Sequence, residues 1–161
     1  MGVTVTSFFA RVSGNKMTGP IPNEIGSVST FWGMNLADPV EGYGLEGTIP
    51  SSIGLLSELQ LIGAPANKLT GTLPPQLGSL SKLRILDVAN NQLTGPAPDN
   101  MCEFVEGLVR CFAEDNSFDC PTTCLEGCGV DTCVERDVAS SSSLALLCAT
   151  AATAATVLVL R

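Results

Sequence analysis

Cysteines are the residues whose type and spacing most directly suggest chemistry in this chain. Six of the seven fall within 32 residues: Cys102, Cys111, Cys120, Cys124, Cys128 and Cys133. An even number of closely spaced cysteines can form disulfides that staple a segment with few apolar residues, which implies an oxidising compartment. The last four also have a spacing that a zinc site could tolerate, but zinc would leave Cys102 and Cys111 unexplained. We therefore expect disulfides, whose pairing the sequence does not determine, and no bound metal.

Catalytic side chains are scarce. The chain has no histidine, so Ser-His-Asp and Cys-His catalysis are excluded. Paired carboxylates remain a route to glycoside hydrolysis. The acids of the repeats described below, however, stand at variable positions typical of a solvated face: Glu24, Glu58, Asp87 and Asp99. The sequence thus predicts a protein that is not an enzyme and needs no cofactor.

The charge balance is acidic, with a formal net charge of -8. Nucleic acid binds to basic surfaces, so we expect no nucleic-acid partner. An acidic surface favours basic or neutral partners, although charge alone does not identify one.

A short sequence motif that recurs four times shows that the chain is built from repeats. Gly19, Gly47, Gly71 and Gly95 each precede a proline by three positions, and the steps between them are 28, 24 and 24 residues. A period in this range indicates stacked structural units that bury their apolar faces against one another. Glycine at each of these positions suits a tight bend.

The apolar spacing within each unit predicts a short strand followed by a turn. The third unit has Leu56, Leu59, Ile62, Ala64, Asn67 and Leu69, and the fourth has Leu80, Leu83, Leu86, Val88, Asn91 and Leu93. The step of two residues fits a strand with alternating faces. The asparagine that follows can hydrogen-bond the turning backbone, so stacked asparagines would form a ladder that satisfies buried backbone groups.

This pattern resembles the plant-type leucine-rich repeat, LxxLxxLxLxxNxLTGxIPxxLGxL, which residues 79–95 match nearly position for position. The resemblance covers roughly residues 7–101 and implies an α/β repeat solenoid. A short parallel sheet would form its concave face, with irregular or 3-10 segments on the convex face. It implies about four repeats over 1–101, the first partial, and a cysteine-rich C-terminal cap over 102–138.

The second unit departs from the pattern because it carries four extra residues. Tyr43 stands where the asparagine is expected, and the insert lies within residues 37–42. Its Asp-Pro and glycine content indicates a loop close to the concave face. It is either a variable surface loop or a loop that contacts a ligand through Asp38, Glu41 and Tyr43.

The C-terminal end is apolar. A Ser-rich spacer at 139–143 precedes 144–161, in which 17 uncharged residues end at Arg161. As a helix, those 17 residues span about 26 Å, slightly short of a bilayer core. The segment is a transmembrane helix, a lipid-anchor signal or a docked terminal helix. The residues after Met1 lack the features of a signal peptide, so we expect that the N-terminus is truncated.

The resemblance implies a receptor-like, membrane-anchored binding module on the extracellular side of the cell surface. Its ligand would be a protein, peptide or glycan, and it would need a co-receptor or other partner to signal. The alternatives are an inhibitor of an extracellular hydrolase, or a structural fragment without independent function. Outward strand positions would bind the ligand: Phe9, Arg11, Asn35, Leu61, Ile85 and Asp87. Phe9, Leu61 and Ile85 should align in one column, interrupted by Gly33.

Overall fold

The computed structural model describes residues 8–38, 40–98, 100, 107–119, 125 and 128–130. Several predictions fall outside these ranges and stay predictions. They concern the spacer at 139–143, the apolar segment at 144–161, and four of the six clustered cysteines: Cys102, Cys120, Cys124 and Cys133.

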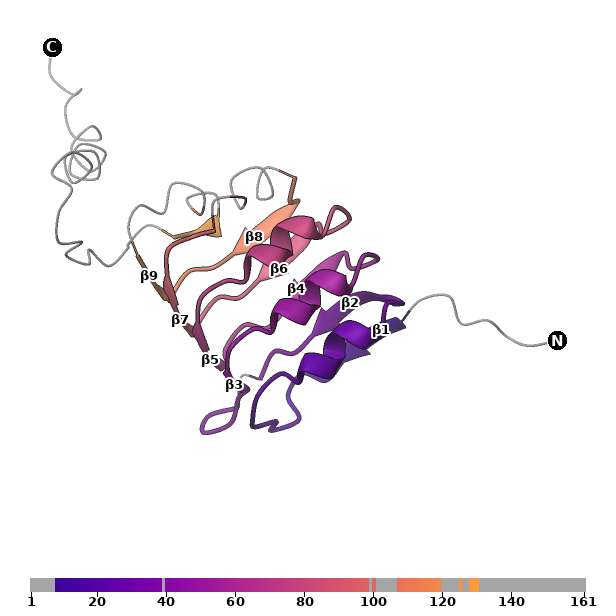
Figure 1. Ribbon diagram of the computed structural model, residues 1–161. Helices are drawn as coiled ribbons and strands as arrows, with labels where there is room; N and C mark the ends of the chain where they lie inside the picture. Colours follow the sequence, from indigo (N-terminus) through magenta and orange to yellow (C-terminus); the bar gives the residue numbers. More distant parts are fainter. Residues whose placement is uncertain are drawn as a thin grey trace, which may run out of the picture.

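The strand that follows each repeat's second leucine joins one parallel sheet. Its order is β1 (Phe8–Arg11), β2 (Phe31–Asn35), β4 (Leu61–Gly63), β6 (Ile85–Asp87) and β8 (Arg110–Phe112). Neighbouring strands are parallel throughout. This confirms the predicted solenoid with a parallel sheet, whose coils stack side by side in Figure 1.

A second row of short strands runs along one side of the stack. It consists of β3 (Glu46–Gly47), β5 (Lys68–Gly71), β7 (Gln92–Gly95) and β9 (Ser117–Phe118). The repeat pattern did not predict this second row. The recurring glycine lies at or beside each bend, with φ of 83° at Gly19 and 76° to 79° at the other three. The chain can therefore turn there without the strain that a side chain would cause.

The remaining side of each coil is a 3-10 segment, as expected. These are η1 (Asn23–Ser27), η2 (Ser51–Leu55) and η3 (Pro75–Ser79), which lie over the five-stranded sheet in Figure 1. Each begins directly after a proline in extended conformation. Sheet, bend, second strand and 3-10 segment together enclose one elongated core.

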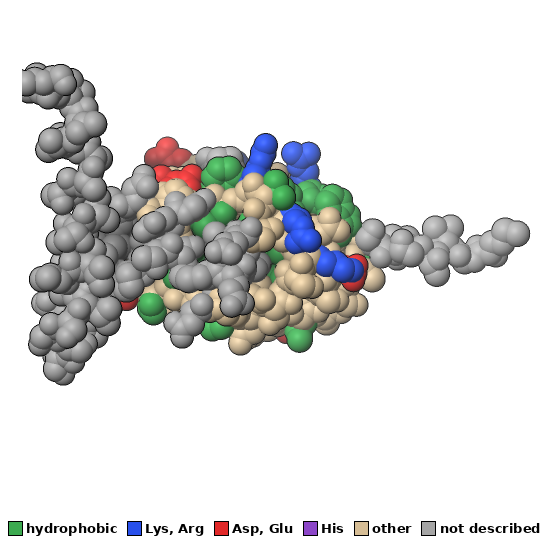
Figure 2. Space-filling view, turned by 90° about the horizontal axis from the view of Figure 1, so that it is seen from above, with side chains coloured by type: hydrophobic (Ala, Val, Ile, Leu, Met, Phe, Trp, Pro, Cys, Tyr) green, Lys and Arg blue, Asp and Glu red, His purple; other side chains and the backbone are tan. Residues whose placement is uncertain are grey.

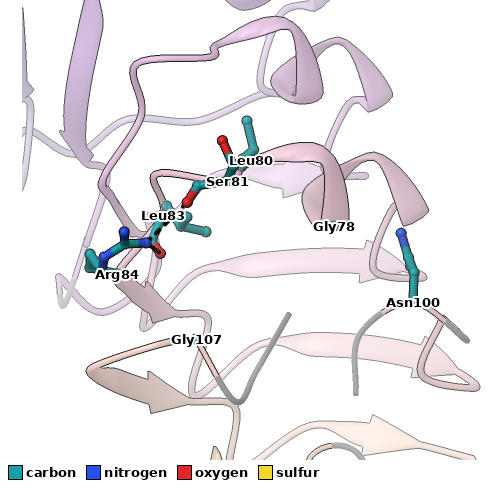
Figure 3. Close-up of a pocket in the computed structure, with 7 residues that line it drawn as sticks. All are labelled: Gly78, Leu80, Ser81, Leu83, Arg84, Asn100 and Gly107. Atoms are coloured by element: carbon teal, nitrogen blue, oxygen red, sulfur yellow. Dashed lines mark hydrogen bonds between the residues drawn. The ribbon is translucent and has the colours of Figure 1, made fainter. Parts of the chain in front are cut away.

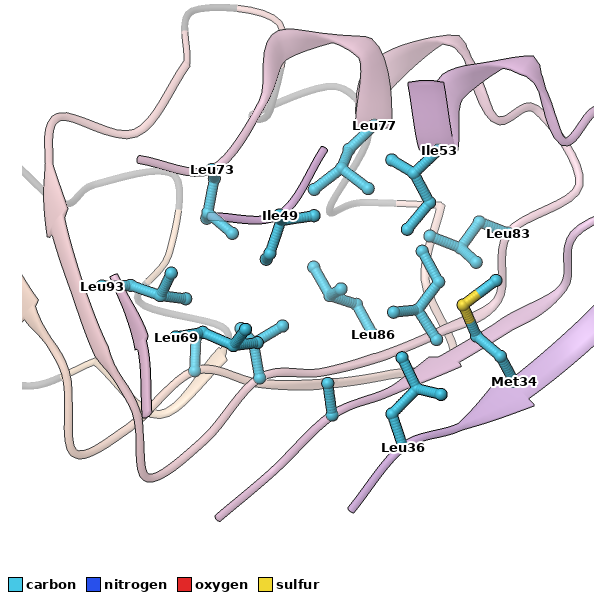
Figure 4. Close-up of a cluster of buried hydrophobic side chains, with 14 of the residues drawn as sticks. Met34, Leu36, Ile49, Ile53, Leu69, Leu73, Leu77, Leu83, Leu86 and Leu93 are labelled. Atoms are coloured by element: carbon cyan, nitrogen blue, oxygen red, sulfur yellow. The ribbon is translucent and has the colours of Figure 1, made fainter. Parts of the chain in front are cut away.

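The core is built from the leucine positions of the repeat. Their side chains point toward one another between the sheets and the 3-10 segments in Figure 4. Leu56, Leu59, Leu69, Leu86 and Leu93 are fully buried. Each fully buried leucine contributes about 1.5–3 kcal/mol, so stacking rather than any single coil stabilises the fold.

A fifth coil lies inside the segment that the sequence analysis assigned to the cap. The steps of three, two, three and two residues recur in Leu108, Cys111, Ala113, Asn116 and Phe118. Ala113 and Phe118 are buried at 0% and 1% exposure. Cys111 takes a leucine position and pairs in register with Leu86, which is why counting leucines did not reveal the coil.

Three buried or half-buried asparagines form the predicted ladder. Asn67, Asn91 and Asn116 accept the backbone N–H of Leu45, Leu69 and Leu93, respectively, in the preceding coil. The amide of each donates to two backbone carbonyls that follow its own strand and to one carbonyl of the preceding coil. One side chain thus binds four backbone groups, some of which also bind a backbone N–H or the next asparagine of the ladder.

In the second coil Asp38, not Tyr43, takes the ladder position. Its Oδ2 accepts the N–H of Met17 at 2.8 Å, and its Oδ1 accepts that of Val40 at 3.4 Å. Asp38 is only 2% exposed. The prediction that this side chain contacts a ligand is therefore corrected, because the carboxylate has a structural role. Asp38 follows Leu36 by two residues, whereas the asparagine of the regular repeat follows the corresponding position by three.

Cys111 and Cys128 form a disulfide that holds the end of the stack. The N–H of Ala113 also donates to the carbonyl of Cys128, and Leu125, Cys128 and Val130 are buried against the last coil.

Within the described ranges, no helix is long and apolar enough to cross a bilayer. Nor does any group of three or more acidic, cysteine or histidine side chains there have the arrangement of a metal site.

The 3-10 segments stack so closely that glycine is required between them. A Cβ atom on Gly54 would lie 2.8 Å from the backbone oxygen of Gln76, so we expect Gly54→Ala to lower the free energy of unfolding by about 1–3 kcal/mol. Gly63→Ala is the matched control, because its methyl would meet no atom closer than 3.8 Å. Urea unfolding measures both, and equal midpoints would contradict close packing of η2 on η3.

Candidate functional site

Alternate residues of the five-stranded sheet point away from the core and form its outer face. The first row of this face, read across the strands, is Phe9, Gly33, Leu61, Ile85 and Arg110. The second row is Arg11, Asn35, Gly63, Asp87 and Phe112. The six predicted positions therefore lie on one face, and Phe9, Leu61 and Ile85 align as expected.

The gap at Gly33 in the first row is filled by an aromatic ring. A Cβ atom on Gly33 would lie 2.7 Å from Cδ2 of Phe9, so the Phe9 ring lies over the glycine. Phe9 also contacts Trp32, with ring centroids 4.9 Å apart. Phe8, Phe9 and Trp32 are each more than one-third exposed. The first coils thus present an aromatic cluster rather than an interrupted column.

The polar side chains of the second row are fixed by their own strand ends. Oδ1 of Asn35 accepts the N–H of Ala37 at 3.1 Å, and Oδ1 of Asp87 accepts that of Ala89 at 3.3 Å. Each bond fixes one oxygen. The NH2 group of Asn35 and the Oδ2 atom of Asp87 are left to bind other groups. Asn35 and Asp87 flank Gly63 in register, one on each side.

Asp87 has an unusual electrostatic environment. Burial raises the pKa of its carboxyl group above the ordinary value, the hydrogen bond from Ala89 opposes the rise, and the negative charge of Glu114 adds to it. The ionised carboxylate is therefore less favourable in the folded chain than in the unfolded chain. A positively charged ligand group would offset this difference.

Basic side chains lie nearer the other ends of the same strands. Figure 2 shows lysine and arginine side chains among apolar ones on this view of the molecule, with a separate group of acidic side chains toward one end. Lys82 pairs with Glu58 at 2.6 Å. Arg84 donates to the carbonyls of Ser81 and Leu83, and Arg110 is exposed at the start of β8. On β6 and β8 the outer face is therefore basic where the strands begin and acidic at Asp87, while Arg11 adds a positive charge to the second row at β1.

The insert loop is part of the connection between β2 and β3. Glu41 and Tyr43 are exposed, and the ammonium of Lys16 lies 5.4 Å from the centre of the Tyr43 ring. Lys68 donates to the carbonyl of Gly42 from the second sheet. These contacts hold the loop beside the stack, so Glu41 and Tyr43 remain candidates for ligand contact and Asp38 does not.

A pocket of about 300 Å³ lies beside the third 3-10 segment. Its lining is Gly78, Leu80, Ser81, Leu83, Arg84, Asn100 and Gly107 (Figure 3). Asn100 and Gly107 flank residues 101–106 in the sequence, which are outside the described ranges.

Sequence reasoning missed three outward residues on this face, namely Trp32, Arg110 and Phe112. Trp32 is the chain's single tryptophan and directly precedes an outward position, which was a usable signal. Arg110 and Phe112 belong to the fifth coil, and the Leu-Cys-Ala-Asn-Phe spacing could have identified them once cysteine was allowed at a leucine position.

Comparisons with known proteins agree with this geometry. A family model described as Leucine Rich Repeat matches residues 82–104. A comparison with curated proteins gives no match. Among solved structures, the LRR ectodomain of the Arabidopsis thaliana membrane receptor kinase GASSHO1/SCHENGEN3, in complex with CASPARIAN STRIP INTEGRITY FACTOR 2, is 35% identical with a TM-score of 0.60. That match covers 69% of this chain and 13% of the receptor.

Two further structures show how widely the fold is used. The plant peptide hormone receptor RGFR1, in complex with RGF2, is 32% identical with a TM-score of 0.60, covering 70% of this chain and 17% of that one. A plant ice-binding protein is 27% identical with a TM-score of 0.57, covering 71% and 35%.

The chain spans 13% of the first of these receptors and 17% of the second, and the fold alone does not determine the ligand. Repeat pattern, stacked coils, asparagine ladder and structural neighbours together identify the described part of the chain as a plant-type leucine-rich-repeat solenoid similar to receptor ectodomains.

Proposed function

We propose that the chain is a non-catalytic binding module that holds a peptide or a protein segment on the outer face of the five-stranded sheet. The observation that carries the proposal is the exposed apolar and aromatic surface along the two rows. It begins at the exposed rings of Phe9 and Trp32, continues through the partly exposed Leu61 and Ile85, and ends at the exposed Phe112. Contiguous exposed apolar surface with polar edges is typical of an interaction site.

The receptor neighbours support a peptide or protein ligand, since one of them is a peptide hormone receptor in complex with its partner. A glycan is the alternative ligand class, because exposed aromatic rings also stack on sugars. We further place the chain at the cell surface in a receptor-like role, with 144–161 as its membrane attachment. The disulfide supports an oxidising compartment, and a separate partner would transmit the signal.

A substitution in the middle of the outer face tests the proposal. Ile85→Glu places a charge between Leu61 and Arg110 in the first row without altering the core side of β6. Wild type and variant are immobilised and panned against a random heptapeptide phage library. We expect the variant to recover at least about tenfold fewer phage, because a charge at the centre of an apolar contact costs more than about 1.4 kcal/mol.

Leu55→Glu is the matched control, because Leu55 is 67% exposed on η2 rather than on the outer face. Its recovery should equal that of the wild type. Wild-type recovery at the level of blank beads, or equal recovery by Ile85→Glu, would contradict the proposed site. Circular dichroism of all three proteins verifies that each is folded.

A further inference from the structure

Asp87 is the one carboxylate in the two rows of the outer face. The N–H of Ala89 occupies its Oδ1. Among the described residues, no donor reaches its Oδ2 and no cation pairs with it, since the ion pair found there joins Lys82 and Glu58. The carboxylate therefore has unused capacity to accept a hydrogen bond from outside.

The two positions beside Asp87 form a seat for an elongated side chain. Gly63 on β4 has no side chain, and a Cβ atom there would meet only Leu61 Cδ2 and Met34 O at 3.8 Å, and Asn35 Cγ at 4.0 Å. Phe112 on β8 lies on the other side and is 41% exposed. Strands about 4.8 Å apart place this gap and this ring within reach of one ligand group.

The surrounding charges favour a cation at this seat. Glu114, two residues beyond Phe112, acts on Asp87 with a like charge. Arg110 lies at the other end of β8 and forms no ion pair with Asp87, while the guanidinium of Arg84 donates to the carbonyls of Ser81 and Leu83. The full chain adds a net charge of -8, which also disfavours a second copy of this chain as the occupant.

We propose that the outer face binds a lysine or arginine side chain of a peptide ligand at Asp87, in the gap between Gly63 and Phe112. This inference rests on the proposed function and specifies the chemistry of its ligand. The cationic group donates to Asp87 Oδ2 in a charge-assisted hydrogen bond and lies against the Phe112 ring. The methylene stem covers Leu61 beside the bare backbone of Gly63.

Asp87→Asn separates a binding role from a structural one. Since the folded-state pKa of Asp87 is raised, ionisation opposes folding. The loss of stability sets in as the pH rises above the unfolded value and is complete above the folded-state pKa. At pH 7 the amide, which can still accept the Ala89 N–H, should leave the melting temperature unchanged or higher while it removes the charge that binds the cation.

The experiment pans the full-length wild type, Asp87→Asn and Gly63→Ala against a random heptapeptide phage library and counts lysine and arginine in the recovered peptides. The most enriched peptide is then synthesised with its basic residue and with norleucine in its place. We expect the wild type to bind the basic peptide about tenfold more tightly, Asp87→Asn to bind the two about equally, and Gly63→Ala to lose part of the preference.

Glu24→Gln is the matched charge control, because Glu24 is exposed on η1 and the variant changes the net charge by the same amount. It should keep the wild-type preference. A preference lost equally in Glu24→Gln, or kept in Asp87→Asn, would overturn the seat at Asp87. Recovery of peptides without basic enrichment would overturn it too but leave the proposed function intact, whereas recovery of no peptides by folded protein would contradict the proposed function itself.

Discussion

Asn91→Ala is expected to lower the free energy of unfolding by about 3–5 kcal/mol. Asn91 is 9% exposed, and its Oδ1 accepts the N–H of Leu69 at 3.0 Å. Its amide donates to the carbonyls of Ala64, Val88 and Ala89 at 2.9–3.1 Å. Alanine removes the acceptor of the Leu69 N–H, and an unsatisfied buried group costs about 1–3 kcal/mol. The three carbonyls each keep a second donor, from Asn67, Asn116 and the N–H of Ala66, so each of their lost hydrogen bonds adds about 0.5–1.5 kcal/mol. The stability of a small domain is only about 5–15 kcal/mol, so urea unfolding should detect the change easily.

Asn15→Ala is the matched control for this prediction. Asn15 has the same place in the first repeat, and its amide donates to the carbonyl of Val12 at 2.8 Å, but it is exposed and water can replace the bond. We expect a loss below about 1 kcal/mol. Equal losses in the two variants would show that the ladder does not stabilise the stack through buried backbone groups.

The same ladder shows how far sequence reasoning reached. The strands, 3-10 segments and asparagines were predictable because each is encoded by a spacing within one repeat. Asp38 was not, because counting back from Leu45 leads to Tyr43, and only the structure shows that the insert moves the acceptor to the other side of the loop. The short second strands were also missed, because two-residue strands such as β3 have no alternation to read and form through their neighbours.

The candidate site was predictable at the level of position but not of environment. Register placed Phe9, Leu61 and Ile85 in one row, as the repeat required. The Phe9 ring over Gly33 depends on a side-chain conformation that spacing does not specify. The seat at Asp87 depends on Phe112, which belongs to a coil hidden by a cysteine at a leucine position.

Replacing Cys111 and Cys128 together by alanine is expected to lower the free energy of unfolding by about 3 kcal/mol. The bond closes a loop with a sequence separation of 17 residues, and a loop of about this length contributes roughly 3 kcal/mol when cross-linked. The bond also holds Leu125 and Val130, both buried, over the open end of the core. Urea unfolding without reductant measures the loss.

The same measurement in dithiothreitol is the control for this double substitution. Reduction opens the bond in the wild type, so the difference between the two proteins should nearly disappear, whatever the other cysteines contribute to both. A double variant as stable as the wild type without reductant would show that the bond does not constrain the fold. Because the bonded coil supplies Arg110 and Phe112 to the outer face, hydrogen exchange in residues 107–119 should rise in the variant. Its preference for basic peptides should weaken together with that protection, which links the cap to binding through the position of β8.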